Sequence, residues 1–333
     1  LSPKNYIVAA QIECLYDLLS VVSPILVTSA EALLQRLMPQ SEFMTATLSL
    51  APGHVFPLSE LINYFVQWGY RRVPLVEEKG EIGVRGGIID FFPPLADCPI
   101  RIEYEGDKID SVRLFDSASQ RSTNPVEEAT ILPMRFFPTS RLQASLRTVE
   151  EDLDRHEAPH REHLRITENI KSGLPFPGVE FFLPYVYPDL DSFDAYLPKN
   201  TLVWAFDPPR QFQICEEFLA KVTSPSTGNR GEERFTLAHE DYYLSPGHAL
   251  EWRTAFATVE VRSLDTLHAP YNVTTKLHTS FKRSEKNLDK EKSLKPLVEA
   301  MHRWRDESRH VFLTASNHRQ ATHLQQLLEG HAT

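Results

Sequence analysis

Apolar and polar residues alternate most regularly between Gly80 and Ser122, with the period of two that is typical of β-strands with one buried face. The turn-forming residues 105–107 separate two such runs, which predicts a hairpin. Upstream, the Gly86-Gly87 pair predicts a bulge or sharp bend, and Pro93-Pro94 ends the apolar run that follows it. The stretch therefore predicts a small, twisted antiparallel sheet.

Alternation also predicts which charged residues of this sheet face solvent. If Val84 and Ile102 point into a core, then four charged residues point to the opposite face: Arg85, Arg101, Glu103 and Glu105. Two arginines on one exposed face could form a binding surface. They are more often solvated charges that keep a sheet soluble and blunt its edges, and alternation alone does not decide between the two interpretations.

Helical and strand patterns alternate on both sides of the sheet, which indicates α/β structure. Before it, helical spacing at residues 6–19 is followed by an apolar run at 25–28, expected to be a buried strand, and by a second helix through 33–37. After it, the apolar run 202–206 is expected to be a buried strand that leads into a helix. Further expected elements are a helix at 58–66, a strand at 73–76, charged helices within 140–170, and a helix, a strand and a helix at 294–304, 311–314 and 321–328.

The composition is that of a soluble protein of two or three domains, with 333 residues, 41% hydrophobic and 24% charged. The formal net charge of -10 argues against a surface that binds nucleic acid throughout, so any DNA contact is expected to be local. Cys14, Cys98 and Cys215 are far apart in the sequence, which indicates neither a disulfide framework nor a metal site. No apolar run is long enough to span a membrane, so we expect a cytoplasmic protein without membrane contact.

Several long strings carry a family resemblance. GYRRVPLVEEKGEIGVRGGIIDFFPP and PIRIEYEGDKIDSVRLFD, followed by QRS, resemble the excision-repair module shared by the excinuclease protein UvrB and the N-terminal region of transcription-repair coupling factors. The later stretch GVEFFLPYVYPDLDSFDAYLP is more similar to the coupling factors. The resemblance covers nearly the whole chain. It implies an α/β fold: an incomplete UvrB-like, P-loop-type α/β domain with an inserted small α+β domain that contains the antiparallel sheet, then the start of a further α/β domain.

This resemblance also implies a division of the chain. The chain begins with Leu1 rather than methionine and ends directly after an expected helix, so we expect a fragment of a longer protein. The expected parts are the end of a first α/β domain at 1–51, the inserted domain at 52–136, the second part of the α/β domain at 137–275, a hydrophilic linker at 276–293 and the start of a small α/β domain at 294–333.

Asp207 follows the expected strand 202–206 at a position where related ATPases hold magnesium with a pair of carboxylates. Here the carboxylate is single, because Pro208 and Pro209 replace the second acid and the residue after it. The chain contains no GxxxxGK[ST] phosphate loop. The resemblance therefore implies a degenerate nucleotide site at Asp207, with no catalytic residue and no cofactor in this chain.

Residues 156–160, HEAPH, match the HExxH pattern in which two histidines one helical turn apart bind zinc. Pro159 lies inside the match, and proline interrupts a helix because it lacks a backbone donor and clashes with the preceding turn. We therefore expect a helix break at this point. The match is interpreted as accidental, with no metal bound.

Two functions of different classes are compatible with these residues. In the first, the chain is a non-catalytic interaction module whose inserted domain binds the excinuclease protein UvrA through the arginines of VRGG and PIRIE, Arg85 and Arg101. Glu105 replaces an aromatic residue of the family, so an apolar anchor of that contact is missing. The whole protein would be an ATP-dependent DNA translocase that contacts RNA polymerase and double-stranded DNA through other domains. The alternative is a fragment of UvrB itself, a damaged-DNA-binding ATPase, and the single carboxylate at Asp207 argues against it.

Overall fold

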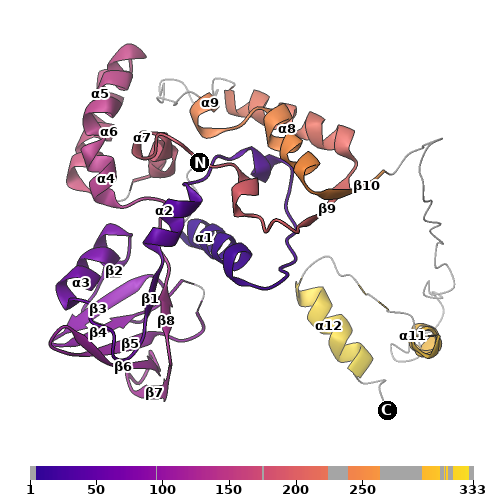
Figure 1. Cartoon of the computed structure of the whole chain (residues 1–333), viewed down its shortest axis with the longest axis horizontal. Coiled ribbons are helices and arrows are strands. Elements are labelled where there is room, and N and C mark those ends of the chain that lie inside the picture. The colour runs from indigo at the N-terminus through magenta and orange to yellow at the C-terminus, as the bar shows by residue number, and fades with distance from the viewer. Residues whose placement is uncertain are drawn as a thin grey trace, which may run out of the picture. The chain divides into compact units, whose positions relative to one another are not determined.

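The computed structural model describes residues 5–94, 96–174, 176–223, 239–262, 295–307, 311, 313 and 318–329. The chain divides into two compact units, Leu1–Leu264 and Asp265–Thr333, which are considered separately (Figure 1). Both helices and strands are present, and the sheets are antiparallel, parallel or mixed. This confirms the expectation of a chain that combines α and β structure.

The largest sheet has six strands in the order in which they occur along the chain. Neighbouring strands are antiparallel except for the first pair, which is parallel. The predicted hairpin after Glu105 and the predicted sharp bend at Gly86-Gly87 are both present as turns between adjacent strands. The strands are β2 (Arg71–Arg72), β3 (Glu81–Arg85), β4 (Ile88–Phe91), β5 (Ile100–Glu105), β6 (Lys108–Phe115) and β7 (Ser122–Pro125).

Helix α3 (Leu58–Gln67) packs against this sheet, as its apolar stripe predicts. Leu61 and Phe65 are fully buried, and the Phe65 ring lies with its centroid 4.9 Å from that of Phe91. Strands β1 (Leu48–Leu50) and β8 (Ala129–Ile131) pair antiparallel, one before and one after the six-stranded sheet. This pairing brings together the two ends of the segment that contains the six-stranded sheet.

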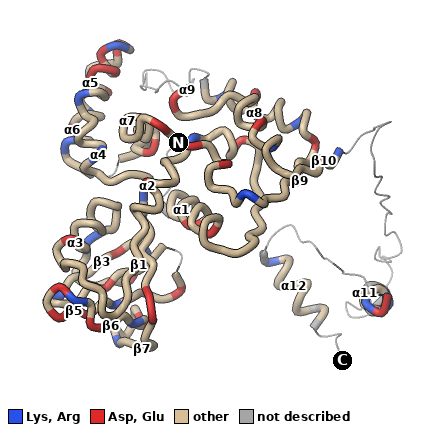
Figure 2. The backbone as a smooth tube through the Cα atoms, viewed as in Figure 1, with Lys and Arg blue, Asp and Glu red and all other residues tan. Residues whose placement is uncertain are grey.

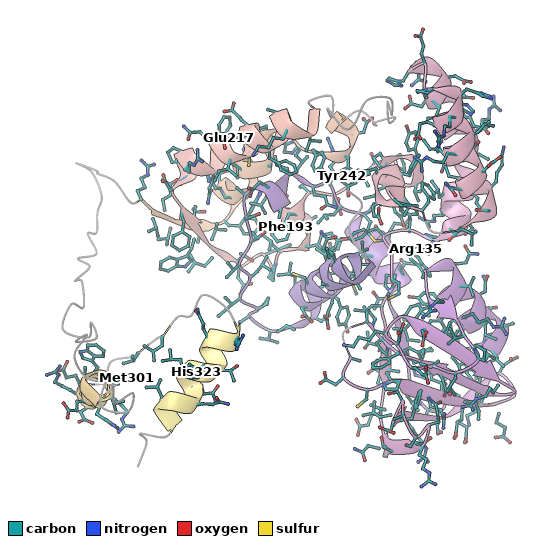
Figure 3. All side chains as sticks on the ribbon, turned by 180° about the vertical axis from the view of Figure 1, so that it is seen from behind. Arg135, Phe193, Glu217, Tyr242, Met301 and His323 are labelled. Carbon is teal, nitrogen blue, oxygen red and sulfur yellow. The ribbon has the colours of Figure 1, made fainter. Side chains whose placement is uncertain are left out.

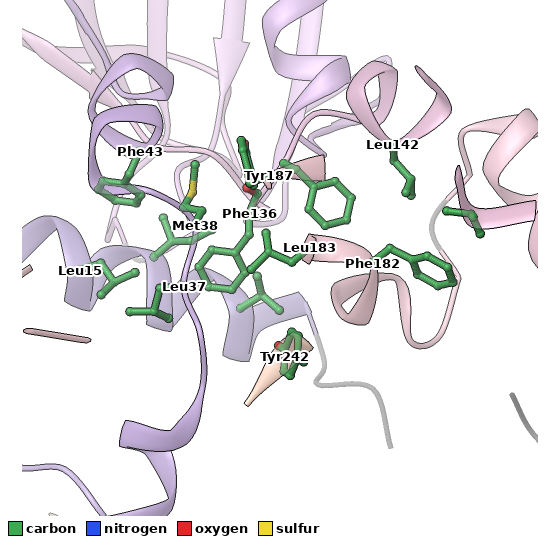
Figure 4. Close-up of a cluster of buried hydrophobic side chains, with 14 of the residues drawn as sticks. Leu15, Leu37, Met38, Phe43, Phe136, Leu142, Phe182, Leu183, Tyr187 and Tyr242 are labelled. Atoms are coloured by element: carbon green, nitrogen blue, oxygen red, sulfur yellow. The ribbon is translucent and has the colours of Figure 1, made fainter. Parts of the chain in front are cut away.

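A second core gathers residues from segments that are far apart in the sequence (Figure 4). It contains Leu15, Phe43, Phe136, Phe182 and Tyr242, and the Tyr196 hydroxyl donates a 2.8 Å hydrogen bond to the Met38 carbonyl inside the same cluster. The helices that supply it are α1 (Asn5–Ser20), α2 (Gln40–Ala46), α4 (Thr139–Ala144), α5 (Leu146–Arg155), α6 (His160–Ser172), α7 (Leu183–Val186) and α9 (His239–Tyr242). The predicted helix at 6–19 and the charged helices within 140–170 are confirmed.

Arg135 lies where the six-stranded sheet region joins this second core (Figure 3), and Gly69 lies directly beside its guanidinium. Gly69 has φ of 98°, a backbone conformation that favours glycine, and a Cβ there would lie 2.5 Å from Arg135 Nε, so the arginine side chain would have to shift. Arg135 donates a 2.8 Å hydrogen bond to Thr139 Oγ1, and burial lowers the pKa of its guanidinium. The Met134 amide donates to the Trp68 carbonyl across the same junction.

The strand at 202–206 is present as β9 (Leu202–Phe206), paired parallel with β10 (Ala257–Val261). Our prediction that it is buried was wrong for alternate residues, because Leu202, Trp204 and Phe206 are more than half exposed. Ala205 points the other way and is buried. The predicted helix after it is confirmed as α8 (Pro208–Thr223), which contacts α10 (Pro246–Glu251).

Three further expectations were wrong. Residues 25–28 form no strand, and Ile25 and Val27 are 95% and 91% exposed, because no strand of the described residues pairs with this run. Residues 33–37 form no α-helix. A short 3-10 turn covers Glu31–Leu34, and the Leu37 amide then donates to the Asp191 carbonyl instead of to a preceding turn. Residues 73–76 are not a strand either, because β2 ends at Arg72 and the chain then turns.

In the second unit, the two predicted helices are present as α11 (Lys295–Asp306) and α12 (His318–Glu329). Val311 and Leu313 are not in a strand, and the rest of the predicted strand 311–314 lies outside the described residues. The predicted linker 276–293 also lies outside them. Among the helices that are described, none is both long enough and apolar enough to cross a bilayer.

The predicted helix break in HEAPH is confirmed. Helix α5 ends at Arg155 and α6 begins at His160, immediately after Pro159. His163 Nε2 lies 3.3 Å from Asp154 Oδ1 across the two helices. Within the described ranges, no three histidine, cysteine or acidic side chains are grouped so that they could hold a metal ion.

The contrast between Phe65 of α3, which is buried, and Phe206 of β9, which is exposed, predicts unequal costs for matched truncations. Phe65→Ala should lower the free energy of unfolding by about 3–5 kcal/mol, because it empties a fully buried site. Phe206→Ala removes an equal side chain that is 62% exposed, and should change stability by less than about 1 kcal/mol. Urea unfolding followed by circular dichroism measures both, and equal losses would contradict the assigned exposure of β9.

Candidate partner-docking surface

The two faces of the six-stranded sheet have different environments. One face packs on α3 and is apolar throughout, with Ile82, Ile89, Ile102 and Val112 among its buried residues. The other face carries the charged residues of β3, β4 and β5. Part of it is covered by a small separate cluster of Val76, Phe92 and Phe115.

Asp90 lies in the middle of the charged face. In the sheet register it stands between Gly83 of β3 and Arg101 of β5, and it is only 3% exposed. Its carboxylate accepts hydrogen bonds from two arginines. Arg101 donates through Nε to Oδ1 at 2.7 Å and through Nη2 to Oδ2 at 3.0 Å, and Arg85 donates through Nη2 to Oδ2 at 2.8 Å. We call these three residues the Asp90 cluster.

The expectation that Arg101 faces solvent was wrong, because Arg101 is 8% exposed. Alternation placed it on the correct face, opposite to Ile102, but that part of the face is covered. Its Nη1 donates to the Gln120 carbonyl at 3.3 Å and to Ser122 Oγ at 3.1 Å, and its guanidinium lies 4.8 Å from the centre of the Phe115 ring. The hydrogen bond to Asp90 raises the pKa of this guanidinium, although burial opposes the effect.

Two loops provide this cover. Val76 lies over Gly83, where a Cβ would be 3.2 Å from a Val76 methyl group, so the loop before β3 approaches the sheet closely. Gln120, in the loop between β6 and β7, donates a 3.0 Å hydrogen bond to the Val76 carbonyl and so joins the two loops. Arg101 is enclosed beneath them.

Arg85 is exposed, as predicted. It is the last residue of β3, and half of its side-chain surface is accessible. The turn after it is tight, because Gly86 has φ of 59°. Within the part of the chain that the structure describes, its one hydrogen bond is to Asp90, so four of its five N–H donors make no hydrogen bond there.

Neighbouring strands extend this exposed region. Arg85 pairs with Ile88 of β4, which pairs with Glu103 of β5, and we call these three residues the docking patch. Ile88 and Glu103 are half-buried, and Glu103 accepts a 2.6 Å hydrogen bond from Ser111. Glu105 is exposed at the end of the hairpin, opposite Lys108. Acidic and basic residues are interspersed over this sheet (Figure 2).

Tyr104 points to the face opposite to that of the docking patch, as alternation predicts, and packs against the apolar core. Burial raises the pKa of Tyr104 to about 12, and the nearby Asp107 carboxylate adds to the effect. Its side chain therefore does not contribute to the docking patch.

Asp207 belongs to a different region, after β9. Its backbone has φ of 50°, its amide donates to the Val261 carbonyl at 2.7 Å, and its carbonyl accepts from the Arg210 and Gln211 amides. These bonds fix the entry into α8, which begins with Pro208. The structure thus brings Arg85 and Arg101 together through Asp90, and Glu105 lies at the end of β5. Asp207 lies in a different region, where its backbone bonds fix the start of α8.

Comparison with known proteins identifies the part that carries this surface. The UvrB interaction domain family matches residues 48–137, which include the whole Asp90 cluster and docking patch. The transcription-repair-coupling factor of Staphylococcus aureus (strain MW2) is 34% identical over 243 residues, 67% of this chain and 20% of its own length. That of Escherichia coli is 30% identical over 203 residues, and that of Myxococcus xanthus 26% identical over 300 residues.

The chain belongs to the transcription-repair coupling factor family. The match to the Escherichia coli coupling factor covers 61% of this chain and 18% of that protein. The match to the Myxococcus xanthus coupling factor covers 85% of this chain and 24% of that protein. The chain therefore spans about a quarter or less of the length of these coupling factors.

Sequence reasoning missed Asp90, which connects the two arginines. A signal was present, because Asp90 is the only charged residue in the apolar run Ile88–Phe92 and alternation places it on the face of Arg85 and Arg101. A carboxylate at that position beside two cross-strand arginines indicates an ion-pair cluster. No local sequence pattern predicted that Gln120 and Ser122 would cover Arg101.

The buried position of Arg101 predicts a stability effect. Arg101→Ala leaves Asp90 buried beside one partly exposed arginine and should lower the free energy of unfolding by about 3 kcal/mol or more. Arg72→Ala, a matched change at an exposed position of the same sheet, should be within about 0.5 kcal/mol of the parent. Denaturant titration measures both. If Arg101→Ala is as stable as Arg72→Ala, Arg101 is not enclosed as described.

Proposed function

We propose that this chain is a non-catalytic protein-interaction module that recruits the excinuclease protein UvrA in transcription-coupled nucleotide excision repair. The observation that carries the proposal is the exposed guanidinium of Arg85, presented by a UvrB interaction domain within a coupling factor relative. The resemblance in sequence implies the same partner for this domain.

The chemistry of the docking patch suits a partner surface of mixed charge. A guanidinium can donate two parallel hydrogen bonds to a carboxylate, so Arg85 fits an acidic side chain of UvrA. Ile88 offers an apolar contact beside it, and Glu103 offers an acceptor on the next strand. Complementary charges of this kind fix the orientation of a partner more than they add to affinity.

Arg101 does not belong to this surface as the structure stands. Four of its five N–H donors are engaged inside the domain, so it supports the patch rather than contacting UvrA. Glu105 is exposed at the same end of the sheet and is placed to modulate the contact. A carboxylate at this position, where an aromatic anchor is expected, lowers the apolar contribution to binding.

We further propose that the remainder of this part of the chain is an incomplete P-loop-type domain without ATPase activity. Asp207 is held by backbone hydrogen bonds at the start of α8, with two prolines where a second acid is needed. The whole coupling factor would be an ATP-dependent DNA translocase that contacts RNA polymerase and double-stranded DNA through regions other than these residues. Nucleotide chemistry would then belong to those regions.

The binding proposal predicts the effect of removing Arg85. Arg85→Ala should weaken UvrA binding about thirtyfold, since losing a charge-assisted contact at an interface costs about 2 kcal/mol or more. Thermal unfolding should change little, because half of the side chain is accessible. Isothermal titration of the full chain with UvrA measures the affinity, with Arg72→Ala as a charge-matched control. Equal affinity of Arg85→Ala and the parent would exclude this surface.

The second proposal predicts that the purified chain shows no magnesium-dependent ATP hydrolysis above buffer. Asp207→Ala should leave that baseline unchanged, because the single carboxylate does not complete a magnesium site. A coupled phosphate-release assay measures both proteins. Turnover that disappears in Asp207→Ala would show that the site is functional.

A further inference from the structure

We infer that Asp90 is the positioning residue of the docking patch: it holds the Arg85 guanidinium at the surface while Arg101 holds Asp90 from beneath. The inference rests on the proposed binding of UvrA and assigns unlike roles to the two arginines. One guanidinium is presented to the partner, and the other is structural.

The first step of the argument is the geometry of the carboxylate. Both oxygens of Asp90 accept from Arg101, and Oδ2 is shared with Arg85. A buried carboxylate with a bidentate arginine partner has a fixed orientation, because the fork geometry permits little rotation. Oδ2 therefore holds Arg85 Nη2 at a defined place on the sheet.

The second step is the side-chain entropy of Arg85. A free arginine at the end of a strand loses side-chain rotamer freedom when it is immobilised at an interface, and this loss weakens binding. An arginine already held by Asp90 has lost part of that freedom before binding. Its Nε, its Nη1 and one proton of Nη2 make no hydrogen bond within the described part of the chain, so donors stay available for a partner carboxylate.

The third step is the local charge. Within the Asp90 cluster, two guanidinium groups and one carboxylate leave a single net positive charge, because the enclosed Arg101 balances Asp90. Glu103 adds one negative charge to the docking patch, two strands away from Arg85. Without Arg101, Asp90 would neutralise Arg85 and would also repel an approaching carboxylate. The buried pair therefore keeps the charge of Arg85 effective at the surface.

The test is a double-mutant cycle on the full chain with UvrA. Asp90→Asn should weaken binding about tenfold in the parent but less than about twofold in Arg85→Ala, because Asp90 acts through Arg85. Thermal melts of the same four proteins separate this effect from stability. A merely structural Asp90 would lower the melting temperature equally in both backgrounds and weaken binding by the same factor in both, which would overturn the inference.

A second measurement needs neither a variant nor a partner. In the parent chain, nitrogen-15 NMR of the arginine side chains should show slowed rotation about the Cζ–Nε bond for Arg85 and Arg101, with Arg72 as the freely rotating control. Fast rotation of Arg85 equal to that of Arg72 would overturn the inference, even if Asp90→Asn fails to fold. If Arg85 is held but UvrA does not bind the parent, the positioning role stands and the proposed partner is wrong.

Discussion

The charged face of the six-stranded sheet depends on the carboxylate of Asp90. A carboxylate that is 3% exposed is costly to bury unless its charge is paired and its lone pairs are satisfied. Arg101 satisfies both requirements, but only because Phe115, Gln120 and Ser122 enclose its guanidinium in turn. Sheet register, loop conformation and surface charge are thus coupled through one ion pair.

Local pattern predicted the sheet well, because its strands are held by neighbours that are close in sequence. Glycine and turn-forming residues identified the turns, and alternation placed Arg85 and Arg101 on the correct face. It could not predict how deeply each face is covered, since the cover of Arg101 comes from residues distant in the sequence: Val76 before it, and Gln120 and Ser122 after it. Exposure was therefore correct for Arg85 and wrong for Arg101.

Apolar runs outside the sheet were less informative. The runs at 25–28 and 202–206 have the composition of buried strands, yet Ile25, Trp204 and Phe206 are largely exposed. An apolar composition shows that a segment can be buried. Burial itself requires another strand or helix packed against the apolar face of that segment. The helix break at Pro159 was predictable because proline acts on its own backbone and needs no distant partner.

The arrangement around Asp90 also explains how two arginines on one sheet face can differ in exposure and in hydrogen bonding. Guanidinium groups bring a donor fork to any partner, but each is useful for recognition only in proportion to the donors left unused. Arg101 uses four donors within the domain, while Arg85 uses one. The two arginines of this sheet face therefore differ in the donors they leave unused, and the loops that enclose Arg101 and leave Arg85 accessible make the difference.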